Sequence, residues 1–284
     1  MKILTILGLL AIMGARPYAE RGTIDFDAVY DALQTHGTWE EIEKNIYAFK
    51  PHDAFAPYRE GKWMYTDFGW MWMGVNSASW AIEHYGVWKQ KDSGEWLWLP
   101  DDKWWPAPVQ WRVSGDYVGW RPCVLDASGF PNPQGTSLNP AEWNFVRRKK
   151  LAGALKSSDF VDFETAKSLL EKSEPLQHTF KAWRDIDRPG PEPSSIHPKI
   201  TIFTIRNIPS PEIQPTEFEP TDVFICRPKF HQDEDGIHKR VQIRLDRTKN
   251  PSTSSEADQK DTHQLQKVME TLEIPPPDSK NPAH

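Results

Sequence analysis

The chain has 284 residues and a formal net charge of −6, with 38% hydrophobic residues and 25 prolines. An acidic chain is a poor partner for nucleic acid, because phosphates select for clustered Lys and Arg, so no nucleic-acid partner is expected. The composition is also too polar and too rich in proline for one packed globule of this length, so part of the chain is predicted to be unstructured.

The N-terminus has the pattern of a secretory signal peptide. Lys2 precedes the apolar run Ile3–Met13, and the small residues Gly14 and Ala15 follow it. A positive start, a short apolar run and a small-residue exit are what export requires, and the run is shorter than the ~20 residues that span a bilayer. We therefore predict a signal peptide over residues 1–19 and an exported, periplasmic or extracellular protein without a transmembrane segment in the mature chain. The alternatives are a buried first strand and a membrane anchor.

A Trp-rich β module is predicted over residues 26–125. Its first residues, 26–33, have helix-compatible spacing but fit an extended lead-in equally well. Downstream, aromatic residues recur two positions apart, which places both rings on one face of a strand. Turn-forming sequences with Gly separate these pairs, which favours short strands joined by tight hairpins. The predicted fold class is mainly β, an antiparallel hairpin meander forming a small sheet, sandwich or barrel. The aromatic pairs are Trp63 and Tyr65, Trp70 and Trp72, and Trp96 and Trp98.

Eleven of the 14 Trp lie between Tyr58 and Trp120, so these rings must fill a core, form a binding face, or do both. Trp104 and Trp105 are adjacent and face opposite ways on a strand, so one of them is expected to be exposed or covered by another element. Indole faces stack on sugar rings while acidic side chains hold hydroxyls. This favours a cell-envelope glycan, or another envelope protein, as partner; the alternative is that both rings belong to the core. The candidate ligand-binding residues are Trp104, Trp105, Asp101, Asp102 and Asp116.

Two groupings of titratable residues offer a catalytic alternative, a carbohydrate-active hydrolase. They are Glu83 with His84, and Asp101 with Asp102. A glycosidase needs two carboxylates about 5–10 Å apart across a cleft, whereas acidic surface turns and a packed histidine explain the same residues without chemistry. The chain has no nucleophile elbow, HExxH motif or phosphate loop. No catalytic residue and no cofactor is assigned, and binding or scaffolding is preferred to catalysis. A purely structural module with a Trp core is a further alternative.

A degenerate Gly-x-Trp repeat runs through the module, and each copy places a Gly turn before a strand that opens with Trp. In this order of motifs the chain resembles a bacterial exported family of Trp-rich domains of unknown function, over residues 30–122. The resemblance implies a β-rich module and an envelope or secreted location, and it implies no activity. Val87 departs from the arginine usual in that family. The motifs are Gly37-x-Trp39, Ala56-Pro57-Tyr58, Gly61-x-Trp63, Gly69-Trp70-x-Trp72, His84-Tyr85-Gly86-x-Trp88, Trp96-x-Trp98-x-Pro100, Pro106-Ala107 and Val118-Gly119-Trp120-x-Pro122.

Residues 126–248 are predicted to form an extension with one helix and a few strands. Asp162 is a good N-cap, and the apolar residues that follow it have the spacing of an amphipathic helix. Residues 249–284 offer too little apolar area to offset chain entropy and are predicted to be a disordered tail. The candidate strands are Ile200–Ile205, Asp222–Cys226 and Val241–Leu245.

Two further features leave alternatives open. Cys123 and Cys226 are the only cysteines, and in an oxidising compartment they would be able to close a disulfide, although the strict geometry of such a bond leaves the pairing undecided. A hydrophilic turn carries metal-donor atoms but lacks the residue order of a calcium loop, so a solvated loop is preferred and no metal site is assigned. The residues of this turn are His231, Asp233, Asp235 and His238.

Overall fold

The computed structural model describes residues 22–52, 55–125, 131–132, 137–176, 190–208, 219–231 and 236–249. The predicted signal peptide and residues 250–284 of the predicted tail lie outside these ranges. Among the helices described, none combines the length and the apolar character that a bilayer crossing needs.

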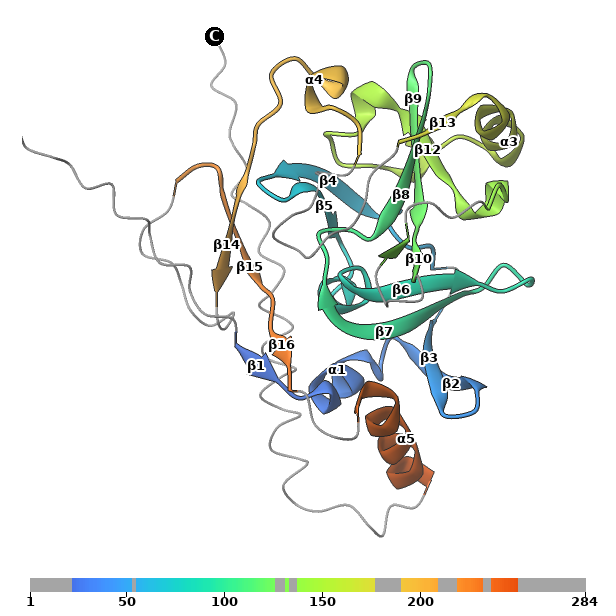
Figure 1. The fold of residues 1–284 in the computed structure, drawn as a ribbon, viewed down its shortest axis with the longest axis vertical. Helices are drawn as coiled ribbons and strands as arrows, with labels where there is room; N and C mark the ends of the chain where they lie inside the picture. The colour runs from blue at the N-terminus through green and yellow to red at the C-terminus, as the bar shows by residue number, and fades with distance from the viewer. Residues whose placement is uncertain are drawn as a thin grey trace, which may run out of the picture.

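Two four-stranded sheets and a separate hairpin make up most of the structure (Figure 1). Their strands pair antiparallel throughout, so the predicted mainly β class with antiparallel hairpins is confirmed. One sheet has the order β2 (Gly37–Glu43), β3 (Ile46–Pro51), β7 (Trp96–Trp104) and β6 (Tyr85–Gln90). The other has the order β12 (Asn144–Arg147), β9 (Tyr117–Pro122), β8 (Val109–Ser114) and β13 (Glu174–Pro175). The hairpin is β4 (Gly61–Thr66) with β5 (Gly69–Gly74).

Cross-strand Trp pairs set the register of the hairpins. Trp63 on β4 lies opposite Trp72 on β5, with ring centroids 5.2 Å apart, and Trp111 on β8 lies opposite Trp120 on β9, at 5.9 Å. Such aromatic pairs stabilise antiparallel strands because the side chains on one face are close neighbours. The Trp63 and Trp111 rings are themselves 4.5 Å apart, so the β4–β5 hairpin packs on the β8–β9 sheet.

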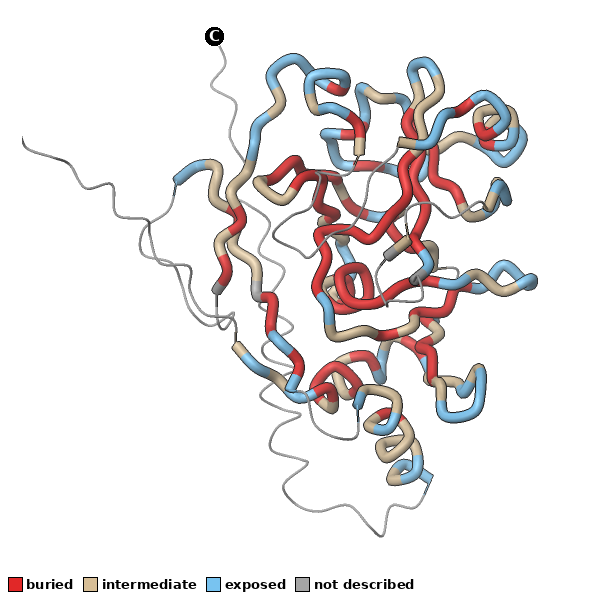
Figure 2. The backbone as a smooth tube through the Cα atoms, in the orientation of Figure 1, coloured by how far each residue is buried: buried red, intermediate tan, exposed pale blue. Residues whose placement is uncertain are grey.

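The Trp side chains form the core. Of the eleven between Tyr58 and Trp120, all but Trp80 are buried, and Figure 2 shows the buried chain running through the inner strands. Several buried indole N–H groups donate to backbone carbonyls, which removes the cost of burying an unpaired donor. Trp120 donates to the Tyr58 carbonyl at 2.9 Å, and Trp88 donates to the Ile82 carbonyl at 2.8 Å.

The helices flank these sheets. Residues 26–33, which fitted either a helix or an extended lead-in, form α1 (Phe26–Leu33). The predicted amphipathic helix is α3 (Phe163–Lys172), and the Asp162 carboxylate caps it by accepting from the Thr165 amide at 2.8 Å. The prediction at Asp162 used apolar spacing that a helix brings to one side, whereas the spacing in residues 26–33 left both alternatives open. The short helices are α2 (Ser79–Ile82) and α4 (Pro193–Ile196), with 3-10 turns at Pro140–Glu142, Arg148–Lys150 and Ser157–Asp159.

One predicted strand of the extension is wrong. The segment Val241–Leu245 belongs to α5 (Gly236–Lys249). Its apolar residues alternate as in a strand, but Ile237, Val241 and Leu245 are also four apart and pack together on the core, with Val241 fully buried. The same residues fit both the alternating period of a strand and the period of a helix, and packing against α1 favours the helix.

Of the other two candidate strands, Asp222–Cys226 is confirmed as β15 (Asp222–Cys226), whereas Ile200–Ile205 overlaps β14 (Thr204–Ile208) only at Thr204 and Ile205. The strands β14 and β15 pair parallel. The residue before β14, Phe203, continues the sheet of the hairpin: its amide donates to the Tyr65 carbonyl at 2.8 Å, and its carbonyl accepts from Asp67 at 2.9 Å. The extension therefore packs against the Trp-rich module (Figure 1). Two further short pairs are β1 (Thr23–Ile24) with β16 (Lys229–Phe230), which is parallel, and β10 (Val124–Leu125) with β11 (Pro131–Asn132).

Candidate functional site

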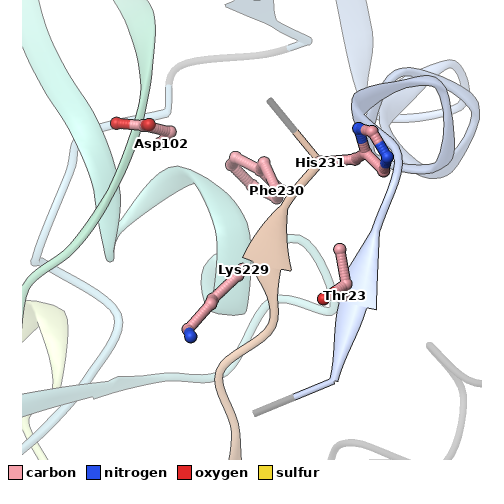
Figure 3. A pocket seen from close by; sticks show the side chains of 5 residues that line it. All are labelled: Thr23, Asp102, Lys229, Phe230 and His231. Carbon is pink, nitrogen blue, oxygen red and sulfur yellow. The ribbon is translucent and has the colours of Figure 1, made fainter. Parts of the chain in front are cut away.

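A pocket of about 430 Å³ lies where β1, β7 and β16 meet (Figure 3). Parallel pairing of β1 with β16 builds one side: the Lys229 amide donates to the Gly22 carbonyl at 2.8 Å, and the His231 amide donates to the Ile24 carbonyl at 2.9 Å. This volume lies within the range of about 300–1,000 Å³ that small-molecule sites occupy. The lining residues are Thr23, Asp102, Lys229, Phe230 and His231.

Alternation along β16 separates the apolar and polar parts of this pocket. Phe230 is buried, and its ring packs on the rings of Tyr85, at a centroid distance of 4.7 Å, and Phe26, at 5.6 Å. Lys229 and His231, on either side of it in sequence, are exposed. Figure 3 shows Asp102 on one side of the Phe230 ring, with His231 and Thr23 on the other. The pocket thus joins an aromatic floor to a carboxylate, an ammonium, an imidazole and a hydroxyl.

The acidic wall consists of a carboxyl pair on β7. Burial raises the pKa of Asp101 to about 6, and a hydrogen bond with the Asp102 side chain acts in the same direction. The Asp102 amide donates to Asp101 Oδ1 at 2.7 Å, and Lys103 Nζ lies 3.8 Å from the Asp101 carboxylate. Asp102, the member that lines the pocket, thus lies next to a carboxyl group whose protonated form burial favours.

The other candidate binding residues lie elsewhere. Trp104 is 5% exposed and Trp105 is 2% exposed, as the core interpretation of these two residues predicts. The His84 ring stacks on Trp104 at 5.4 Å, and the Arg227 guanidinium lies 4.8 Å from the Trp104 ring centroid, so no sugar ring has access to either indole. Asp116 is exposed in the β8–β9 turn and does not line the pocket.

Glu83 and His84, the candidate catalytic pair, are buried away from the pocket lining. The Glu83 carboxylate accepts from the Tyr58 amide at 2.8 Å and from Trp72 Nε1 at 2.9 Å, and burial raises its pKa to about 7 against the effect of these hydrogen bonds. Burial lowers the pKa of His84 to about 4, so the ring is neutral at pH 7 and its Nδ1–H donates to the Trp105 carbonyl at 2.8 Å. These contacts give both residues a structural role in holding the aromatic core together.

The remaining candidate groups are separated. Cys123 is a buried, free thiol, and the side chain of Cys226 lies outside the described part of the structure. His231 lines the pocket, whereas His238 on α5 accepts from the Tyr47 amide at 3.2 Å. Asp233 and Asp235 are not among the described residues, and within the part that is described no three His, Cys, Asp or Glu side chains gather as metal ligands do.

Reasoning from the sequence named two of the residues that line this pocket, Asp102 as a ligand-binding candidate and His231 as a metal-donor candidate, and did not single out Thr23, Lys229 or Phe230. Thr23 and Lys229 are brought side by side by a two-residue parallel ribbon whose strands are about 200 positions apart in the chain. Neither residue belongs to a motif. The local alternation of polar and apolar residues at Lys229, Phe230 and His231 is the one available signal, and it is too short to distinguish a strand from a loop.

A model of a family of unknown function (DUF6600) matches residues 30–127. No curated protein and no solved structure matches the chain. Of the pocket residues, Asp102 alone lies within the matched range, while Thr23 precedes it and Lys229, Phe230 and His231 follow it. The pocket is therefore composite, since it requires the matched module together with segments on both sides of it.

Proposed function

We propose that this chain is an exported binding or scaffolding protein of the cell envelope or the extracellular space, and that its ligand occupies the pocket between β1, β7 and β16. The observation that carries this proposal is the pocket itself, which sets polar and charged side chains around the Phe230 ring. Ligand sites combine apolar surface with a few converging polar groups in this way.

In this proposal the Trp-rich module holds the pocket in place, and its Trp104 and Trp105 rings do not contact the ligand. The His84 ring and the Arg227 guanidinium both pack on the Trp104 ring, and Trp104 and Trp105 are buried. Recognition of a glycan by stacking on these indoles would require the core to open. The exposed pocket residues Lys229 and His231 are accessible without any rearrangement, which favours them as the contact residues.

The geometry of the acidic pair favours binding over hydrolysis. Glycosidases place their two carboxyl groups about 5–10 Å apart, so that a substrate oxygen or a water molecule fits between them. Asp101 and Asp102 are hydrogen-bonded to each other, which leaves no such space. Glu83 is enclosed by Tyr58 and Trp72 and has no path to a substrate.

Export is tested by locating the mature protein in its native cell. We expect the protein in the periplasmic or extracellular fraction, with an N-terminus that begins after the apolar run Ile3–Met13. Fractionation with N-terminal sequencing measures both. Recovery in the cytosol alone, with Met1 intact or simply removed, would overturn this part of the proposal.

Binding is tested by calorimetric titration of the full mature chain with peptidoglycan fragments, polysaccharide fragments and short peptides. We expect one class to bind, and Lys229→Ala to weaken that binding at least about tenfold, as loss of a charge-assisted contact does. Lys149→Ala is the matched control, because Lys149 is also exposed but lies in the 3-10 turn Arg148–Lys150. Equal binding by wild type and Lys229→Ala, or no binding by any class, would contradict the proposal.

A further inference from the structure

We propose that Trp70 on β5 and Trp111 on β8 form a recognition site for a Gly-Pro-x-Pro segment of a partner protein. In the free chain its own residues 190–193, Gly-Pro-Glu-Pro, occupy this site. The inference goes beyond the proposed function, because neither Trp70 nor Trp111 lines the pocket. It follows from the contacts that residues 190–196 make with the Trp-rich module.

Gly190 lies against both indole rings, with no room for a side chain. A Cβ atom at this position would be 2.6 Å from Trp70 Cδ1 and 3.1 Å from Trp111 Cε2. Its φ of 112° also lies in a region that residues with a side chain rarely adopt. Close packing and backbone conformation each select glycine at this position, so the site is specific for it.

Pro191 is held through both its carbonyl and its ring. Trp70 Nε1 donates to the Pro191 carbonyl at 2.8 Å, and Pro191 is buried. Aromatic-lined grooves recognise proline-rich chains in this way, because the fixed φ of proline reduces the entropy lost on binding. The next residue, Glu192, has φ −54° and ψ 128°, which is close to polyproline II geometry, and its side chain is exposed.

A single helical turn, α4, completes the bound segment. Pro193 is its first residue, where the missing N–H needs no partner and the fixed φ suits a helix. Ile196, three residues further on, is 8% exposed and packs in the hydrophobic core. Ser194 and Ser195 between them are exposed. The sequence pattern that the site selects is therefore Gly-Pro-x-Pro-x-x-apolar.

The buried donor at this site has its acceptor outside the family-matched range. Trp88 and Trp120 donate to carbonyls within that range, whereas Trp70, which is 2% exposed, donates to residue 191. The Tyr85 hydroxyl likewise donates outward, to the Pro228 carbonyl at 2.7 Å. A buried donor without an acceptor is costly, so this module requires a carbonyl from another segment at each of these two positions.

The segment that fills the site is replaceable. In the described part of the chain, no backbone ladder joins residues 190–196 to a strand. Their described hydrogen bonds to other segments come from two side chains, Trp70 and Arg148, whose guanidinium donates to Ser195 Oγ at 3.3 Å. Phe203, by contrast, is joined to β4 by backbone hydrogen bonds. A partner's segment is thus able to take the site while the extension stays attached at Phe203.

The test is calorimetric titration of the full mature chain with the acetylated and amidated peptide Gly-Pro-Glu-Pro-Ser-Ser-Ile, the sequence of residues 190–196. In the wild type the tethered segment competes at a high effective concentration. Gly190→Ala weakens that segment and leaves the indoles intact, so we expect this variant to bind the peptide at least about tenfold more tightly than the wild type.

Gly94→Ala is the matched control for Gly190→Ala. Gly94 also has a positive φ, 89°, but a Cβ atom there would meet nothing within 4 Å. Its substitution adds backbone strain without disturbing the indoles. We expect the Gly94→Ala protein to bind the peptide as weakly as the wild type does.

Two further changes assign the contacts. A peptide with alanine in place of its glycine should bind the Gly190→Ala protein at least about tenfold more weakly, since this Cβ meets the indoles as well. Adding Trp70→Phe to that protein should weaken binding about tenfold, because the proline carbonyl loses its donor. Adding Trp143→Phe is the control, since Trp143 Nε1 donates elsewhere, to the Ser137 carbonyl at 3.2 Å.

Exchange of indole N–H groups in the wild type provides a test that needs no variant. A segment that leaves its site exposes the Trp70 N–H without unfolding the module. We expect this N–H to exchange with solvent faster than that of Trp120, whose acceptor is the Tyr58 carbonyl, as NMR of the side-chain N–H signals would show. Equal exchange of both groups, through global unfolding alone, would overturn the proposal.

The titrations give further outcomes that would overturn it. They are failure of a folded Gly190→Ala protein to bind the peptide, equal binding by Gly190→Ala and wild type, and equal binding of the glycine and alanine peptides. Sedimentation of the wild type at rising concentration addresses a second copy as the partner. A dimer that the peptide dissociates would assign the site to exchange between two copies and overturn the assignment to a partner protein.

Discussion

Tyr58 and Glu83 are hydrogen-bonded to each other at two points in the interior. The Tyr58 amide donates to Glu83 Oε1 at 2.8 Å, and the Tyr58 hydroxyl donates to the Glu83 backbone carbonyl at 3.1 Å. Tyr58 has φ 55°, a left-handed conformation that bulky side chains avoid and that persists only where the surroundings impose it. Here Trp120 completes the restraint by donating from Nε1 to the Tyr58 carbonyl at 2.9 Å.

This contact predicts a dependence of stability on pH. Burial raises the pKa of Glu83 from its ordinary value of 4.5 to about 7 in the folded protein, so between these values the folded state retains a proton that the unfolded state has lost. The stability that this proton contributes is complete below the unfolded pKa and is lost as the pH rises through the folded pKa. We expect the free energy of unfolding to fall by about 1 kcal/mol between about pH 6 and about pH 8.

Urea denaturation at a series of pH values measures this effect. The Glu83→Gln variant cannot ionise at this position, so its free energy of unfolding should change less over the same pH interval. Its free energy of unfolding should also be lower than that of wild type at the start of the interval, because the glutamine NH2 group would face the N–H of Tyr58 or Trp72, to which the carboxylate is an acceptor. The His84 effect has the opposite sign and lies at lower pH: its pKa is lowered to about 4, so its contribution is lost as the pH falls below the unfolded value. Parallel curves for wild type and Glu83→Gln would contradict the assignment.

Arg227 is predicted to be a structural cation in the aromatic core. It is 1% exposed, and its guanidinium lies 4.8 Å from the Trp104 ring centroid and 5.2 Å from that of Phe68. A desolvated cation–π contact contributes about 2 kcal/mol, against about 0.5–1 kcal/mol at an exposed site. Arg227→Ala should therefore destabilise the fold by at least about 2 kcal/mol and uncover Trp104.

Two measurements check the Arg227 prediction. Urea denaturation reports the loss of stability, and acrylamide quenching of Trp fluorescence reports the exposure of Trp104. Arg147→Ala is the control, since Arg147 lies 4.9 Å from the Tyr117 ring but is exposed. If both variants lose the same small amount of stability and quenching does not change, Arg227 does not support the core.

Gly74 is predicted to tolerate no side chain. A Cβ atom at this position would lie 2.2 Å from Glu83 Oε2 and 2.3 Å from Ser79 Oγ. Gly74→Ala must displace the buried carboxylate, at a cost of about 1–3 kcal/mol for overpacking. Gly153→Ala is the control, because its nearest neighbour would be the Lys150 carbonyl at an ordinary 3.5 Å. Thermal denaturation of the two variants compares them; a Gly74→Ala protein as stable as Gly153→Ala would refute the close approach.

Cys123 is predicted to be unreactive in the folded protein. It is fully buried, and burial raises the pKa of its thiol, so little thiolate is present and reagents have no access to it. We expect no labelling of Cys123 by a thiol reagent until denaturant is added, as mass spectrometry of the labelled peptide would show. Labelling of native Cys123 would contradict this. Absence of labelling even in denaturant, reversed by a reductant, would instead reveal a disulfide with Cys226, the pairing that the sequence leaves open.

Local pattern determined much of the secondary structure. Aromatic residues two apart, such as Trp70 and Trp72, lie on β5 as the alternation predicts, and Asp162 begins α3 as a capping residue should. These features depend on neighbours within a few positions, so a linear sequence contains them. The same local information was insufficient for Val241, because its apolar neighbours fit a strand and a helix equally well and contact with α1 decided between them.

The pocket was decided by tertiary structure alone. The sequence identified Asp102 as a candidate, but Lys229 reaches the same pocket only because β16 pairs with β1 and packs on β7. Likewise, the burial of Trp104 depends on Arg227, more than 100 positions away. Periodicity specifies which face of an element is apolar. Which elements meet, and therefore which side chains line a cavity, follows from packing all of those faces at once.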